Sequence, residues 1–402
     1  MSLLSFKNFL VESKNLHLEH LEDIMFLEGS SGIDDAIEFL KAISEMLSSK
    51  TKGRYDLTVK WDGAPAVFAG INPENGKFFV GTKAIFNKTP KINYTHADID
   101  KNHKGGLVTR LKVALSELPK LGIKGILQGD MMFMKNDLSN KTIGGENYVT
   151  FTPNTITYTV PVDSKLAREI QGAKMGIVWH TKYSGKTMRN LKASFTPRIS
   201  SLRKTRDVWY DDASFKDTAG TSTMTNKEQK DLNKLIDIIE DKKGIGDYVD
   251  DLITDTFIIS ELKIYINSKV RQGANLSSAG DYISYMDSKM QDDVDSMKSE
   301  KGKEKKANLR AEVLNKLKKD KGNIQKVFNL HNAITNAKSK IIIKLNSVKD
   351  IGTFVKTDDG FKVTAPEGFV AVDRLGKNSF KLVDRLEFSQ QNFNAAKNWI
   401  KG

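Results

Sequence analysis

Hydrophobic positions recur with a helical spacing near the start of the chain. Behind the Gly-Ser-Ser-Gly break at residues 29–32, apolar residues return every three or four positions and mark one face. They are Ile33, Ala36, Ile37, Leu40, Ile43 and Leu47. The spacing predicts a packing helix within an N-terminal helical segment, residues 1–55, in front of the main domain.

The period changes to that of strands from residue 57 to residue 86. Two apolar runs there are separated by Asn-Pro-Glu-Asn-Gly at residues 72–76, a sequence typical of a hairpin turn. A helix is predicted over 107–121, where leucines and Ala114 share one side. Three further strands are predicted at 125–133, 154–162 and 175–183.

Residues 226–346 are predicted to be helices with polar connections. Within them, residues 296–326 are rich in lysine and poor in apolar side chains. Such a stretch is either a solvated face or a surface that follows a phosphate backbone. Strand character returns at residue 354 and continues to 383, so a sheet with a helical insertion is the simplest arrangement.

This pattern predicts an α+β fold in four parts. An N-terminal helical segment (1–55) precedes the first part of a β-rich core (56–225). A lysine-rich helical insertion (226–346) follows, and the second part of the core (347–402) ends the chain.

Composition narrows the classes of function. The 402 residues are 39% hydrophobic and 28% charged, and the net charge of +13 favours a polyanionic partner, with nucleic acid the best fit. The absence of cysteine excludes disulfides, thiolate catalysis and cysteine-bound zinc. A metal would therefore sit on oxygen or histidine ligands, and carboxylate-bound Mg²⁺ is favoured because the six histidines are scattered.

Two segment types are missing from the sequence. No apolar run approaches the ~18 residues of a membrane helix, and the N-terminus lacks the basic start and cleavage site of a signal peptide. We therefore expect a cytoplasmic protein with no membrane partner.

The first candidate for chemistry is Lys60, which ends an apolar run and precedes Trp61, Asp62 and Gly63. A lysine becomes a nucleophile when it loses its proton, and burial favours the neutral amine. By itself, however, the tetrapeptide favours a β-hairpin with an Asp-Gly turn and a lysine that faces solvent.

Three later segments add to Lys60. Asp130 follows a glycine in an apolar strand, Glu367 leads into another strand, and Lys381 is embedded in apolar sequence. Singly, the two acids are typical turn formers. Together the segments supply a nucleophile, two acids for a metal ion and a cation that faces phosphate.

In this order the segments resemble the motifs of the covalent nucleotidyltransferases, the superfamily of ATP-dependent DNA ligases, RNA ligases and mRNA capping enzymes. The resemblance covers the non-helical part of the chain. It implies an ATP-grasp-like core of two antiparallel sheets, in which Lys60 attacks the α-phosphate of ATP and forms lysyl-AMP. Lys83 matches the basic hairpin position, Asp130 the acid of Gly-Glu, Glu367 the metal-holding acid of Glu-Gly, and Lys381 the first lysine of the last motif.

The resemblance also implies ATP and Mg²⁺ (or Mn²⁺) as cofactors, with Asp62 and Gly63 beside the nucleotide, and with Asp130 and Glu367 at the metal. Adenine needs an aromatic face, for which Tyr158 is the first choice and Trp179 the second. Both rings are equally typical of an ordinary hydrophobic core.

The chain departs from the motifs at three positions. Pro65 replaces the arginine of many DNA ligases and capping enzymes, and Asp130 is a shorter acid than glutamate. Val383 replaces the second lysine of the last motif, with Arg385 or Lys377 as a spatial substitute.

The layout is most similar to phage-type RNA ligases and to proteins of large phages, so that the host cytoplasm is the expected compartment. We therefore expect an ATP-dependent polynucleotide ligase that joins 5′-phosphate to 3′-hydroxyl ends, of RNA in preference to DNA. The alternatives are a nucleotidyltransferase with another acceptor, a ligase-like protein that binds without catalysis, and a virion or assembly component.

Overall fold

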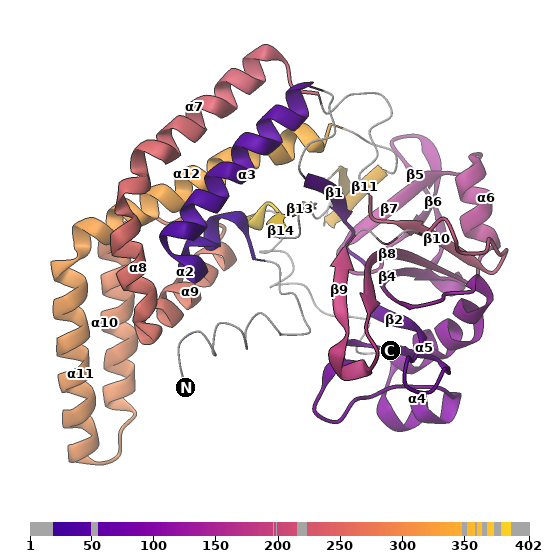
Figure 1. Cartoon of the computed structure of the whole chain (residues 1–402), viewed down its shortest axis with the longest axis horizontal. Coiled ribbons are helices and arrows are strands. Elements are labelled where there is room, and N and C mark those ends of the chain that lie inside the picture. The colour runs from indigo at the N-terminus through magenta and orange to yellow at the C-terminus, as the bar shows by residue number, and fades with distance from the viewer. Residues whose placement is uncertain are drawn as a thin grey trace.

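Most of the helices lie on one side of the molecule, and the sheets, with α4 (His96–Asn102), α5 (Gly106–Glu117) and α6 (Lys165–Gly172), lie on the other (Figure 1). The computed structural model describes residues 19–49, 55–195, 197, 199–214, 223–347, 352–357, 360–363, 368–373 and 379–386. The chain is an α+β protein, as the sequence predicts. A helical body lies on one side, a β-rich body lies on the other, and β1 (Tyr55–Lys60) and β13 (Gly368–Asp373) lie between them.

The amphipathic helix predicted near the N-terminus is α3 (Ser30–Ser49), which follows η1 (Leu21–Asp23) and α2 (Met25–Glu28). Its apolar face packs on α7 (Asn226–Lys242) and α12 (Lys321–Leu345), and the residues of all three helices share one hydrophobic cluster. The N-terminal segment and the insertion therefore form one helical body, although they were predicted as separate parts.

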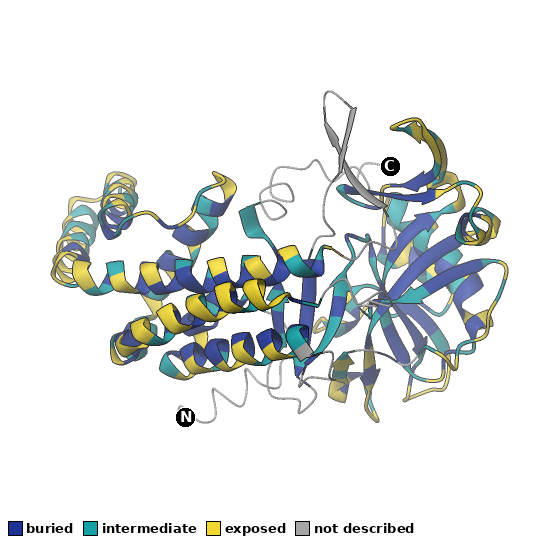
Figure 2. Cartoon of the chain, turned by 90° about the horizontal axis from the view of Figure 1, so that it is seen from above, coloured by how far each residue is buried: buried dark blue, intermediate teal, exposed yellow. Residues whose placement is uncertain are grey.

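The insertion consists of helices, as predicted. Between α7 and α12 lie η6 (Lys243–Ile245), α8 (Gly246–Thr254), α9 (Thr256–Arg271), α10 (Ala279–Asp295) and α11 (Glu300–Lys319). Most of the lysine-rich stretch, residues 296–326, forms α11, which buries only Val313, Leu314 and Leu317, and its last residues begin α12. Figure 2 shows the exposed faces of the helices as yellow stripes along the outside of this body. Within the described residues, no helix has the length and apolar character needed to cross a membrane.

The described strands form three sheets, where the resemblance implied two. The small sheet has the order β1-β13-β14, with β14 at Ser379–Leu382. The outer sheet has the order β12-β11-β7-β6-β5, and its strands are β5 (Ser139–Ile143), β6 (Glu146–Phe151), β7 (Ile156–Pro161), β11 (Gly352–Thr357) and β12 (Gly360–Val363). The hairpin of β5 and β6 was not predicted, because its strands are short and β5 has no buried residue.

The central sheet has the order β10-β8-β4-β2-β3, with β9 also paired to β8. Its strands are β2 (Ala66–Ile71), β3 (Phe78–Gly81), β4 (Ile126–Met134), β8 (Met175–Ser184), β9 (Lys192–Phe195) and β10 (Val208–Asp212). The resemblance implied antiparallel sheets. The pair of β8 and β10 is parallel, so this sheet is mixed. β9 and β10 were not predicted.

Helices cover one face of the central sheet. The helix predicted over 107–121 is α5 (Gly106–Glu117) followed by η3 (Leu118–Leu121), and α4 (His96–Asn102) precedes it. Their leucines pack against alternate residues of the strands, such as Val67, Leu127 and Met131. Because side chains alternate along a strand, the residues between these face the other side, where the outer sheet, α6 (Lys165–Gly172) and a cavity lie.

A buried ion cluster joins the two ends of the described chain to α12. Lys338 of α12 donates to both carboxylate oxygens of Glu22 at 2.6 and 2.7 Å, and each side chain is 1% exposed. Asp23 accepts from Arg385 at 2.8 Å and lies 3.0 Å from His331 Nε2. Arg385 is therefore bound within the helical body, which corrects its prediction as a substitute for the second motif lysine.

Charge partners control the pKa values of the two acids in this cluster. Burial raises the pKa of the Glu22 carboxyl, but the charge of Lys338 and its other cationic neighbours outweighs burial and leaves it below its usual value. Burial likewise raises the pKa of Asp23, and the hydrogen bond to His331 with the charge of Arg385 outweighs it. Both carboxylates are therefore ionised at neutral pH.

For His20, unlike the two acids, burial determines the direction of the pKa shift. Burial lowers the pKa of its imidazole well below the usual value, against the raising effect of Glu22. The charges of Lys338, Arg385 and Lys381 lower it further. The imidazole of His20 is therefore neutral at neutral pH.

Replacing Lys338 with methionine should lower the free energy of unfolding by about 3–5 kcal/mol, because Glu22 would keep a buried charge without its partner. Urea denaturation at pH 7 measures this change. As a control, Lys41→Met removes the exposed Lys41–Glu240 pair and should cost less than about 1 kcal/mol. Equal unfolding midpoints for Lys338→Met and the wild type would contradict the assignment.

Acidification below pH 6.5 should destabilise the protein through His20. Because the folded pKa of His20 is depressed, the unfolded chain binds the proton first, and stability falls as the pH falls. The loss is up to about 1.4 kcal/mol per pH unit. Urea midpoints between pH 7 and 5 should decline less steeply for His20→Gln than for the wild type, and parallel curves would rule His20 out as the cause.

Candidate functional site

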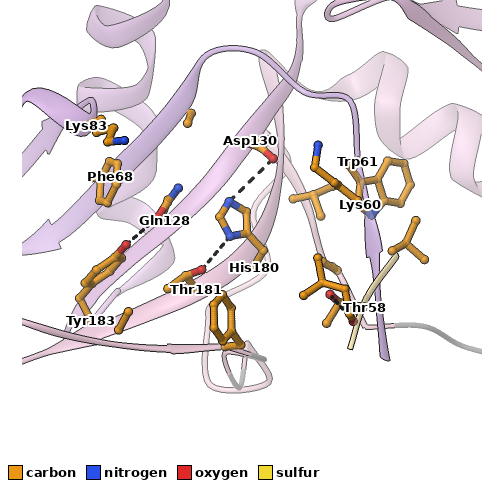
Figure 3. Close-up of a pocket in the computed structure, with 17 residues that line it drawn as sticks. Thr58, Lys60, Trp61, Phe68, Lys83, Gln128, Asp130, His180, Thr181 and Tyr183 are labelled. Carbon is orange, nitrogen blue, oxygen red and sulfur yellow. Dashed lines mark hydrogen bonds and ion pairs between the residues drawn. The ribbon is translucent and has the colours of Figure 1, made fainter. Parts of the chain in front are cut away.

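A cavity of about 290 Å³ lies between the small sheet and the central sheet (Figure 3). Three residues that the sequence predicted as site residues line it: Lys60 at the end of β1, Lys83 at the start of η2 (Lys83–Phe86), and Asp130 in β4. In Figure 3, Asp130 and His180 lie between the two lysines. The fold therefore brings together three segments that are far apart in the sequence.

Asp62 fixes the turn that follows Lys60. Its carboxylate is 3% exposed and accepts four hydrogen bonds from the start of β7. The donors are Asn154 Nδ2 at 2.7 Å, the Thr155 backbone N–H at 2.7 Å, Thr155 Oγ1 at 2.6 Å and the Ile156 backbone N–H at 2.9 Å. Only a group with two acceptor oxygens satisfies all four donors. Asp62 does not line the cavity, so its role in the structure is to hold the position of Lys60.

Gly63 lets the same turn pass close to β4. A Cβ atom on Gly63 would lie 2.5 Å from the Asp130 Cβ and 3.0 Å from Met132 Sδ, which no side chain tolerates. A backbone hydrogen bond extends this contact: the Ala64 N–H donates to the Met131 carbonyl at 3.0 Å. The Asp-Gly pair thus ties β1 to the outer sheet through Asp62 and to the central sheet through Gly63.

Tyr158 lies behind this turn. Its ring is 2% exposed and stacks on Phe151 with centroids 5.5 Å apart, and its hydroxyl accepts the Asp62 backbone N–H at 2.8 Å. The Trp61 ring lies 5.2 Å away. Tyr158 does not line the cavity. It offers no face to adenine there, contrary to our first choice, and instead supports the Lys60 segment.

Trp179 is fully buried in the core between the central sheet and its helices. A β-bulge in β8 explains why the next residue, His180, faces the cavity instead. Gln128 pairs with Thr181 while Gly129 pairs with Trp179, so His180 is an extra residue in β8. The bulge places both His180 and Thr181 on the cavity side. Our second choice for adenine therefore faces away from the cavity, and its neighbour faces into it.

His180 is the main site residue that sequence reasoning missed. Its Nδ1 lies 2.8 Å from Thr181 Oγ1, and its Nε2 lies 3.7 Å from Asp130 Oδ2. The available signal was a pair of polar residues, His180 and Thr181, that breaks the alternation at the end of an apolar run. An imidazole beside a carboxylate, in a cavity that Lys60 also lines, is able to carry a proton between reacting groups.

Aromatic side chains form one end of the cavity. Phe68 of β2, Tyr183 of β8 and Phe195 of β9 all line it. The Tyr183 hydroxyl donates to Gln128 Oε1 at 2.8 Å, and burial raises the pKa of the phenol to about 12. Tyr183 therefore remains a protonated donor at neutral pH. No pattern in the sequence distinguishes these rings from other aromatic residues.

The register of the small sheet relates Lys381 to Lys60. Thr58 pairs with Val370 and Val370 pairs with Lys381, so all three share a face with Lys60, which is two residues from Thr58. β14 is two strands from β1, a separation of roughly 10 Å. Lys381 is not among the residues that line the cavity, so the structure does not bring it to the other three.

Glu367 and Lys377 lie outside the described residues. Their predicted roles at the metal and in the last motif stay predictions. Among the described residues, no group of three or more His, Asp and Glu is close enough to hold a metal. Asp130 lines the cavity with one carboxylate, and Mg²⁺ commonly takes one or two carboxylates together with substrate phosphates.

Comparison with known proteins identifies a family but no characterised relative. The sequence model of a family of unknown function, DUF6267, matches residues 15–397. Searches of curated proteins and of solved structures give no match.

Replacing Asp62 with asparagine should destabilise the protein by about 3 kcal/mol. The side-chain NH₂ group would then face N–H and O–H donors whose hydrogen bonds a carboxylate oxygen accepts in the wild type. Thermal or urea unfolding measures this. Asp34→Asn is the matched control, since Asp34 is exposed and 3.7 Å from Lys243, and it should change stability by less than about 1 kcal/mol. Full stability of Asp62→Asn would show that Asp62 does not hold the turn.

Proposed function

We propose that this chain, which belongs to the DUF6267 family, is an ATP-dependent polynucleotide ligase that works through a covalent lysyl-AMP on Lys60. One observation carries the proposal: Lys60, Lys83 and Asp130, which the order of motifs selected, line one cavity although they lie in separate segments. The alternative interpretation, in which Lys60 is a solvent-facing hairpin residue, does not explain why Lys60 lines a cavity together with Lys83 and Asp130.

The first step would transfer AMP from ATP to Lys60. The neutral Lys60 amine attacks the α-phosphorus, an N–P bond forms, and the P–O bond to the β-phosphate breaks, so that pyrophosphate leaves. The amine loses a proton in the process. An in-line transfer of this kind depends on position and on neutralisation of phosphate charge more than on covalent chemistry by the protein.

The other residues of the cavity have matching roles in this proposal. Lys83 would neutralise phosphate charge, and His180, oriented by Thr181 and Asp130, would accept the proton that Lys60 releases. Phe68, Tyr183 and Phe195 would contact the adenine, the role first predicted for Tyr158 and Trp179.

A divalent cation fits this site as a companion of the nucleotide. Asp130 would hold it together with phosphate oxygens, and Glu367 is the second acid that the sequence predicts. When bound, Mg²⁺ would withdraw charge from the phosphates. Asp130 packs against Gly63 of the turn that follows Lys60, so the fold itself sets the spacing between nucleophile and acid.

Sealing would use the AMP held on Lys60. A 5′-phosphate oxygen attacks the phosphorus, the N–P bond breaks, and the freed amine recovers a proton. The 3′-hydroxyl of the second end then attacks the activated 5′-phosphate and displaces AMP. RNA is the proposed strand in preference to DNA, because the layout is most similar to RNA ligases.

A second candidate is a protein that binds nucleotide and nucleic acid without transfer. Val383, which occupies the place of the second motif lysine, is 3% exposed and packs in the apolar cluster near Trp61 and Met132. Its position therefore has no room for a solvated cation. In this case the protein would bind ATP without forming a covalent product.

Incubation with ATP labelled at the α-phosphate, with Mg²⁺, should label the wild-type chain covalently, and Lys60→Ala should reduce the label at least about a hundredfold because the nucleophile is gone. Denaturing gel electrophoresis measures the label. Lys77→Ala is the matched control, since Lys77 is exposed and lies outside the cavity. Label that survives in Lys60→Ala would overturn the proposal, and a wild type that binds ATP but takes no label would favour the second candidate.

A further inference from the structure

The basic charge of the chain is concentrated in the β-rich body. Residues 56–225 contain 25 Lys and Arg against 15 Asp and Glu, an excess of ten. The lysine-rich insertion, residues 226–346, contains 23 against 19, an excess of only four. A polyanion would therefore meet its strongest attraction near the sheets.

Two segments of this body contain basic residues but no acidic residues. Residues 82–92 include η2, and residues 182–192 include η5 (Met188–Asn190); together they contain seven Lys and Arg and no Asp or Glu. Lys182 and Lys192 alternate with the cavity-lining Tyr183 and Ala193, so they project from the other face of the sheet. The remaining five, which we call the basic loop surface, are Lys83, Lys88, Lys91, Lys186 and Arg189.

The two segments lie against each other and against the cavity. Ile85 and Met188 are buried in one small hydrophobic cluster, which also contains Phe68 and Tyr183. The backbone N–H of Met188 donates to Glu74 at 3.1 Å, which brings one acid to this region. Lys83 and Tyr183 belong to the segments and line the cavity. The basic loop surface is therefore continuous with the wall of the site.

These cations are not neutralised within the described part of the chain. None of the five forms an ion pair there, and all five are exposed. Lys91 donates only to a backbone carbonyl, that of Asn102.

α11 differs in this respect. Four of its eight Lys and Arg form ion pairs: Lys303 with Glu300, Lys306 with Asp293, Arg310 with Asp287, and Lys316 with Asp255. Figure 1 also places α11 at the end of the helical body that is farthest from the sheets. Of the two interpretations of the lysine-rich stretch, the solvated face has the better support.

We propose that the basic loop surface binds the phosphodiester backbone of a nucleic-acid strand and leads the end of that strand into the cavity beside Lys60. Lysine ammonium groups on loops contact phosphates as point charges and do not read bases, so this surface would position a strand without selecting its sequence. Delivery of the end to Lys60 rests on the proposed function, whereas the binding itself does not.

The test compares two full-length triple variants with equal loss of charge. One is Lys88→Gln, Lys186→Gln and Arg189→Gln in the basic loop surface. The other is Lys301→Gln, Lys305→Gln and Lys318→Gln, which removes exposed lysines of α11 that form no ion pair among the described residues. Fluorescence anisotropy measures the affinity for labelled single-stranded RNA and DNA of one sequence, roughly 20 nucleotides long, from 50 to 200 mM salt.

The loop variant should bind both strands at least about tenfold more weakly, and the slope of log affinity against log salt should fall by about 2, since each lost contact with a single strand contributes about 0.7. The α11 variant should stay within about twofold of the wild type. A charge-preserving variant, Lys88→Arg with Lys186→Arg and Arg189→Lys, should bind as the wild type does.

Equal losses in the two triple variants, a loss confined to the α11 variant, or no binding by the wild type at 50 mM salt would each overturn the inference. Covalent labelling by ATP is measured on the same proteins. A wild type without label that still needs the loop cations for binding would contradict the proposed function alone, so the two failures are distinguishable.

Discussion

The carboxylate of Asp62 sets the geometry on which the site depends. Its four hydrogen bonds attach the end of β1, in the small sheet, to the start of β7, in the outer sheet. One residue later, Gly63 packs against β4 of the central sheet. Three sheets are thus joined within three residues of Lys60. A buried carboxylate with this many donors has one orientation available, because any rotation would leave donors unpaired in the core.

The cavity follows from this junction and from the alternation of side chains. In β2, and in β4 as far as Met131, even-numbered residues such as Phe68, Gln128 and Asp130 face the cavity, and odd-numbered ones such as Val67, Leu127 and Met131 face the helices. β8 would continue the same rule, but its bulge adds His180 and turns Thr181 to the cavity side as well. One extra residue in one strand therefore places an imidazole beside Asp130.

The elements of the fold were largely predictable, since they depend on local periodicity. The apolar spacing that predicts α3 is the spacing that the structure buries, and β4 and β8 begin and end within a residue or two of the predicted limits. Which surface covers α3 was not predictable, because its partners α7 and α12 follow some 200 to 300 residues later and any apolar face would satisfy the pattern. Periodicity indicates that a face is buried but not against what.

Site residues were predictable to the extent that their role is encoded next to them. Lys60 and Lys83 adjoin strand ends, Asp130 follows a glycine within β4, and motif order identifies all three, which line the cavity. Tyr158 and Trp179 were chosen by residue type, and type does not distinguish a ring that contacts a ligand from a ring that fills a core. His180 was missed because a bulge is a property of two paired strands, and a single sequence read along its length does not contain the pairing.

The small sheet gives the helical body a part in the site, although none of the described residues of that body lines the cavity. One face of this sheet, with Phe369, Ala371, Phe380 and Leu382, belongs to the hydrophobic cluster of the helices. Its other face carries Thr58, Lys60 and Val370 at the cavity. The helices therefore hold one wall of the cavity in place, and the buried pair of Glu22 and Lys338 fixes the N-terminal segment to α12 behind that wall. A shift of the helical body would move Lys60 relative to Asp130 and His180, because β1 belongs to the wall and ends at the Asp62 junction.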